Sequence, residues 1–180
     1  RSAGLSAGPG LLLAVDPVRA HCAPSVFVPN DRFFLFPTHF HEQITHFPWS
    51  SPAPVALTPA PEETHTIEFL AEVESKHQIT DWETVRRLAD LHFWTEETLR
   101  ERFDYSEATG ISLAFLRVFR LSEPWTFPDE KKFGGCRSWL DLPTPPETLS
   151  LTPVLDDTTH AARRNSLAVL LAGSPAAEHA

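Results

Sequence analysis

The sequence predicts an α+β fold built on a mainly antiparallel sheet, and two apolar segments indicate it. Residues 111–121 are almost wholly apolar, as expected for a central strand buried on both faces. After a polar loop at 122–132 and two glycines, residues 136–142 alternate in polarity, which is typical of a half-buried strand. The elements run strands, a helix pair, strands and a helix, without the alternation of parallel βαβ units. We expect three helices and a mainly antiparallel sheet, with a barrel-like form of that sheet as an alternative.

Length and composition predict one domain. A chain of 180 residues can bury a core without disulfides or metal. We expect a single domain at 25–172, an incomplete or atypical N-terminal segment at 1–24 and a disordered tail at 173–180. The absence of methionine predicts a fragment, the two cysteines favour a reducing, cytoplasmic location, and no apolar run is long enough for a membrane span.

Negative charge is concentrated in one part of the chain. The formal net charge is −9, and residues 61–110 contain thirteen Asp or Glu against five Lys or Arg, a balance of −8. Such a surface repels polyanions. A nucleic acid would therefore have to contact the Arg-bearing sheet.

Short β-type runs precede the central strand. The candidates are 11–15, 26–28 and 33–36, the last two separated by a Pro-Asn-Asp turn. Five prolines at 48–61 predict an extended loop. Residues 66–73 alternate in polarity, which favours a strand with one face toward solvent.

Capping patterns predict the helices. Thr80 and Glu83 fit a capping box, followed by an apolar face at helical spacing. That face comprises Trp82, Val85, Leu88, Ala89 and His92. A second helix starts at Thr95, and a last helix starts near Asp156 or Asp157 and runs to Ala172.

Histidines near residue 40 are candidate metal ligands. In an extended segment, His39 and His41 project to one face and could bind one divalent metal, with His46 or Glu42 as a further ligand. The alternative interpretation is a pair of surface histidines at a strand end.

Asp31, Glu74 and Lys76 are candidate catalytic residues. An acidic residue followed by Glu-x-Lys is the arrangement of restriction-type nucleases, in which carboxylates hold Mg²⁺ and the lysine stabilises the transition state. The alternative is a solvated strand end in an acidic segment.

The segment Phe133–Trp139 contains candidate ligand-binding residues. Gly134 and Gly135 allow a close backbone approach to a ligand, and Arg137 and Trp139 share one strand face where they could contact a base or phosphate. The alternative is a tight turn with Trp139 packed under a helix. Cys136 as a nucleophile lacks an identifiable base.

Arg117 is a further ligand-binding candidate because it interrupts an apolar strand. A buried arginine needs a partner. The alternative interpretation is a salt bridge to an acidic residue of the helix pair.

Three motifs together resemble a known family. The motifs are FFLFPTHFH at 33–41, LHFWTEETLRERF at 91–103, and LRVFRL with GGCRSWLDL within 116–142, followed by TPVLDD at 152–157. They resemble the bacterial family catalogued as domain of unknown function 1802, over about residues 26–171. The resemblance implies a bacterial, cytoplasmic protein and no established activity. The chain lacks the family's basic Gly-rich turn upstream and has Glu42 where the family tends to have Gln.

These observations leave three functional hypotheses open. The first is a non-catalytic module that binds nucleic acid or a nucleotide, by analogy with PUA-like and ASCH-like folds. The second is a metal-dependent nuclease or other hydrolase. The third is a structural or interaction protein. The oligomeric state and the substrate are not determined by these patterns.

Overall fold

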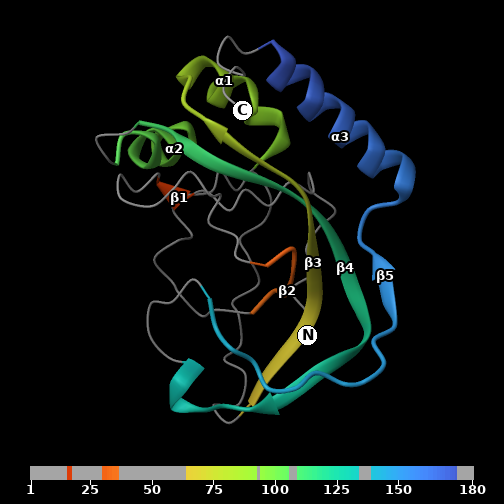
Figure 1. Ribbon diagram of the computed structural model, residues 1–180. Coiled ribbons are helices and arrows are strands. Elements are labelled where there is room, and N and C mark those ends of the chain that lie inside the picture. Colours follow the sequence, from red (N-terminus) through yellow and green to blue (C-terminus); the bar gives the residue numbers. More distant parts are fainter. Residues whose placement is uncertain are drawn as a thin grey trace, which may run out of the picture.

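The structure, a computed structural model, describes residues 16–17, 30–36, 64–92, 94–105, 109–133 and 139–173. Within these ranges the fold is α+β, and three α-helices gather around one end of an antiparallel sheet (Figure 1). The strands are β1 (Asp16–Pro17), β2 (Arg32–Phe34), β3 (Thr64–Ile79), β4 (Ile111–Pro128) and β5 (Leu151–Pro153). The helices are α1 (Trp82–Arg87), α2 (Glu96–Phe103) and α3 (Asp157–Ala172), with 3-10 turns η2 (Ala89–Leu91) and η3 (Lys131–Phe133). The prediction of an α+β fold with three helices is confirmed.

Two long strands, β3 and β4, form the centre of the molecule. They pair antiparallel from Ile79 opposite Ile111 to Thr64 opposite Pro128. Every residue from Ile111 to Leu116 is buried, so the prediction of a central strand covered on both faces is confirmed.

Both strands are longer than the sequence predicts. The prediction of a loop at 122–132 is wrong for residues 122–128, because β4 continues to Pro128. Pro124 is tolerated since β4 has no β3 partner between Arg120 and Trp125, so its missing N–H removes no bond to β3. Likewise β3 extends beyond Val73, because its last residues pair with the start of β4.

The sheet is open rather than closed. Its strand order is β1-β4-β3-β2, with β5 also pairing with β4. In the described residues β2 at one edge does not pair with β1 or β5, so the barrel-like alternative is wrong.

The half-buried strand expected at 136–142 is also not observed where the chain is described. Residues 139–150 carry no strand, and the first part of the expected strand, 136–138, lies outside the described residues. Leu140 and Leu142 instead pack against the core from an irregular segment. The edge of β4 at Phe119–Leu121 is occupied by β5, which supplies the ladder bonds in its place.

The helix caps follow local chemistry, with one correction. Asp81, not Thr80, is the N-cap of α1: its carboxylate accepts the Thr84 N–H at 2.8 Å and the Thr84 hydroxyl at 2.6 Å. Thr95 and Asp156 cap α2 and α3 as expected, and α3 ends at Ala172.

The first helix is shorter than its apolar face suggests. It ends at Arg87, and a 3-10 turn carries the chain to His92, which is buried. No helix in the described part of the chain is long and apolar enough to cross a membrane.

Three apolar clusters divide the interior. The helix cluster lies between the helices and the sheet and comprises Ile79, Val85, Leu88, Leu91, Leu99, Phe103, Ile111, Leu113, Phe115 and Leu167. The aromatic cluster, toward the other end of β3 and β4, comprises Ile67, Leu70, Leu121, Trp125, Phe127 and Phe133. A small third cluster consists of Ala71, Ala114 and Leu116. Neighbouring residues of β2 point to opposite faces of the sheet, so Phe34 packs on the aromatic cluster and Phe33 packs on the third cluster.

Candidate functional site

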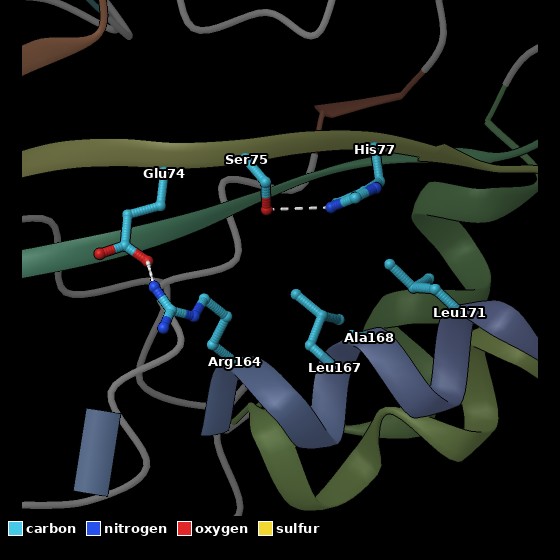
Figure 2. Close-up of a pocket in the computed structure, with 7 residues that line it drawn as sticks. All are labelled: Glu74, Ser75, His77, Arg164, Leu167, Ala168 and Leu171. Atoms are coloured by element: carbon cyan, nitrogen blue, oxygen red, sulfur yellow. Dashed lines mark hydrogen bonds and ion pairs between the residues drawn. The ribbon is translucent and has the colours of Figure 1, made fainter. Parts of the chain in front are cut away.

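A pocket of about 490 Å³ lies between β3 and α3. Strand β3 contributes its polar wall, and α3 contributes an apolar floor together with one arginine (Figure 2). The lining residues are Glu74, Ser75, His77, Arg164, Leu167, Ala168 and Leu171. This volume falls within the range typical of small-molecule sites, about 300–1,000 Å³.

Two periodicities place these side chains. On β3, Ser75 and His77 are two residues apart and therefore point to the same face, toward α3 (Figure 2). On α3, residues 164, 167, 168 and 171 recur at the spacing of one helix face. The small side chain of Ala168 leaves room between the two elements.

An irregularity in β3 adds Glu74 to the same wall. The register with β4 shifts between Val73 and Ser75, so Glu74 has no residue opposite it. Such bulges re-aim side chains and are frequent next to functional sites. Glu74 thereby lines the pocket beside Ser75 instead of projecting to the opposite face.

Ser75 and His77 are hydrogen-bonded to each other. The Ser75 Oγ and the His77 Nε2 lie 2.9 Å apart. Burial lowers the pKa of His77 below its ordinary value of 6.5. The imidazole is therefore neutral at pH 7, and one ring nitrogen is a hydrogen-bond acceptor.

Glu74 faces two cationic or potentially cationic groups of α3, one turn apart. The His160 Nε2 is 2.9 Å from the Glu74 Oε1, outside hydrogen-bond geometry, and the Arg164 guanidinium is 3.8 Å from the Oε2. His160 is buried and its ring lies 5.0 Å from that of Phe115. The Arg164 side chain is 58% exposed, so its donors can reach a ligand.

The three candidate catalytic residues do not form one cluster. Lys76 Nζ lies 3.0 Å from the Asp31 Oδ1, but Glu74 is directed to α3. Adjacent positions on a strand project to opposite faces, and the bulge turns Glu74 to the face of Ser75 rather than that of Lys76. Among the described residues, no group of three His, Cys, Asp or Glu side chains could hold a metal ion.

Arg117 has a structural partner. Its guanidinium lies 2.5 Å from the Asp157 carboxylate at the start of α3, and its side chain is 11% exposed. The acidic partner comes from the last helix, not from the helix pair that the sequence suggested. Arg117 ties β4 to the N-terminus of α3.

Other candidate ligand-binding and metal residues are only partly located. Trp139 is half-buried, and its ring meets that of Phe33 edge-on at 5.1 Å. Gly134, Gly135 and Arg137, the three candidates before it, lie outside the described residues. His39 and His41, the candidate metal ligands, lie outside them as well.

Sequence reasoning missed most of the pocket. The predicted strand ended at Val73, before Ser75 and His77. Had it been extended, the spacing of these two residues could have indicated a polar face of β3. Nothing in the sequence indicated that Arg164 and His160 of α3 would meet β3, because that contact depends on the packing of distant segments.

The comparisons with known proteins give a family and no relative of known function. No curated protein and no solved structure matches the chain. The family model described as "Domain of unknown function (DUF1802)" matches residues 25–166, which is more than three quarters of the sequence. The chain therefore belongs to this family of domains of unknown function.

Proposed function

We propose that the chain is a binding module for a mononucleotide, held in the pocket between β3 and α3. The observation that supports it best is the combination, in one pocket, of an apolar floor with a guanidinium, a carboxylate, a hydroxyl and a neutral imidazole. Ligand sites are typically apolar surfaces with a few convergent polar groups.

Each part of a nucleotide has a suitable partner here. The base would lie against Leu167 and Leu171, because a flat aromatic ring buries well on an aliphatic surface. Ribose hydroxyls would donate to the Glu74 carboxylate. The phosphate would take charge-assisted hydrogen bonds from Arg164, whose guanidinium is 3.8 Å from Glu74 and can turn toward an anion.

The charge of the chain favours a single nucleotide over a polymer. The net charge of −9 repels a long nucleic acid, whose affinity depends on many phosphate contacts. One phosphate at one arginine is less affected, because salt screens charges more than about 10 Å away. The basic groups of the sheet point the same way, since Arg32, Lys76 and Arg117 are already paired with carboxylates.

Calorimetric titration with adenine and guanine nucleotides tests this proposal. We expect wild-type protein to bind, and Arg164→Gln to weaken binding roughly tenfold or more, because a hydrogen bond to a charged group contributes about 1.5–3 kcal/mol. Arg86→Gln is the matched control: Arg86 is also half exposed but pairs with Glu83 and Glu96 away from the pocket. Absence of binding to wild type, or an equal effect of both variants, would contradict the proposal.

A second candidate is a metal-dependent nuclease or hydrolase, favoured by the pairing of Asp31 with Lys76. For this activity a divalent metal would have to bind Asp31, and Glu74 would have to leave its partners on α3. Plasmid nicking in Mg²⁺ or Mn²⁺ that disappears in Asp31→Asn would support it. Wild-type protein that neither nicks DNA nor retains metal after purification would eliminate it.

A further inference from the structure

We propose that the same pocket has an acyl-ester hydrolase activity in which Ser75 is the nucleophile and His77 its general base. The substrate class is an activated carboxylic ester with an apolar acyl group. This activity does not depend on nucleotide binding, although both would use one pocket.

The hydrogen bond between the two side chains supports the assignment. Ser75 Oγ lies 2.9 Å from His77 Nε2, within the reach required of a nucleophile and its base. In the tautomer that carries its proton on Nδ1, the imidazole accepts the Ser75 hydroxyl proton at Nε2. Both residues line the pocket, so the Oγ is accessible to a ligand there (Figure 2).

The neighbouring charged groups of the pocket bear on the pair in two ways. Glu74 has its own partners, His160 and Arg164, so the nearest carboxylate is engaged with α3. Burial lowers the pKa of His77, which leaves the imidazole unprotonated and able to accept a proton at neutral pH. Arg164 lines the same pocket and lies 3.8 Å from Glu74, and its positive charge would favour the anionic tetrahedral intermediate if the guanidinium turns toward Ser75.

The reaction balances with water as the second substrate. Ser75 Oγ attacks the ester carbonyl carbon, and its proton passes to His77 Nε2. The bond from that carbon to the alkoxy oxygen breaks, and His77 returns the proton to the leaving alcohol. Water then attacks the acyl-serine, its proton passes through His77 to Oγ, and the carboxylic acid leaves with Ser75 restored.

The acyl group has a defined place in this pocket. Leu167, Ala168 and Leu171 form the floor opposite Ser75, and an aliphatic acyl chain would bury against them. A longer acyl chain should therefore react more readily than acetate until the floor is covered.

The experiment is acylation of the full chain by p-nitrophenyl acetate and butyrate, followed by peptide mass mapping. We expect a burst of p-nitrophenol and an acyl group on the peptide that carries Ser75. Ser75→Ala should abolish both, and His77→Gln should slow acylation about a hundredfold, the usual contribution of a general base. Ser75→Cys should move the acyl group to the new thiol, which separates loss of the nucleophile from loss of folding.

Two matched controls complete the test. Ser166→Ala removes an exposed hydroxyl of α3 that donates to the Ala162 carbonyl, and His65→Gln removes another histidine of β3. Both should react like wild type. An acyl group found only on other residues, or an unchanged burst in Ser75→Ala, would overturn the proposal, and neither result would bear on nucleotide binding by Arg164.

Discussion

Two histidines on one strand have contrasting environments at the two ends of the molecule. At the aromatic cluster, His65 Nε2 lies 2.6 Å from the Asp129 carboxylate, and its ring contacts Phe36 and Phe133. At the helix cluster, His77 instead pairs with the neutral hydroxyl of Ser75. At the aromatic cluster the histidine is therefore packed among rings and paired with a carboxylate. At the helix cluster the histidine is neutral and lines a pocket.

The packing partners explain this difference. At the aromatic end, the segment after β4 folds back and fills the space with Phe133, which lies 5.5 Å from Phe127. At the helix end, α3 approaches β3 through Glu74 and His160, and the small Ala168 leaves a space. At the aromatic end the rings pack directly on one another, whereas at the helix end a pocket lies between α3 and the bulged strand.

Replacing one buried phenylalanine at each end of the molecule should have the largest effect on the free energy of unfolding. Phe115→Ala in the helix cluster and Phe127→Ala in the aromatic cluster should each lower the free energy of unfolding by about 3–5 kcal/mol, because both rings are buried. Urea unfolding measures this loss.

The two variants should differ at the pocket. Phe115 contacts His160, whose imidazole faces Glu74, so Phe115→Ala should also shift the ring resonances of His77 and His160 in NMR spectra. Phe127→Ala should leave those resonances in place. A loss below about 1 kcal/mol in either variant would contradict the assigned burial.

Removal of the α2 cap should have a smaller effect. The Thr95 hydroxyl accepts the Thr98 N–H at 3.2 Å, and Thr95→Ala should lower the free energy of unfolding by about 1 kcal/mol. Thr152→Ala, at an exposed position of β5, is a control. Equal stability of Thr95→Ala and wild type by thermal unfolding would argue against this cap.

The smallest expected effect is a change in how stability depends on pH when His77, the histidine at the helix end, is replaced. Burial lowers the pKa of His77 and of His92, so the unfolded chain binds protons that the folded chain does not. Stability from these groups is present above pH 6.5 and is lost as the pH falls from there through their lower folded-state pKa values. His77→Gln should therefore lose less stability than wild type between pH 7.5 and 5.5.

Unfolding in urea at both pH values provides the measurement. Gln78→Ala, on the next position of β3 and exposed, should keep the wild-type slope. A steeper slope in His77→Gln than in wild type would show that the sign of the shift is wrong.

Local patterns were sufficient for most of the elements. The caps at Thr95 and Asp156 and the end of α3 at Ala172 depend on hydrogen bonds within a few residues, which a sequence displays directly. The buried run from Ile111 was equally clear. The prediction of a strand at 139–142 was wrong. Alternating polarity shows which side chains can pack, but it does not show whether the edge of a neighbouring strand is free.

The contacts of the candidate site residues were likewise predictable only in part. The pairing of Asp31 with Lys76 follows an expected association of acidic and basic groups, yet Glu74 separated from them because a bulge redirected it. Arg117 was expected to need an acid, but its partner, Asp157, is forty positions along the chain.

The sequence by itself determined the α+β class, the buried central strand, the caps of α2 and α3, the end of α3 and the family, because each depends on residues that are close in the chain or on a motif order. Only the tertiary structure decided that the sheet stays open and that Ser75 and His77 face Arg164 across a pocket. The physical reason is that strand pairing and helix docking join segments that lie far apart in the chain, and no local pattern specifies which distant surface a side chain meets.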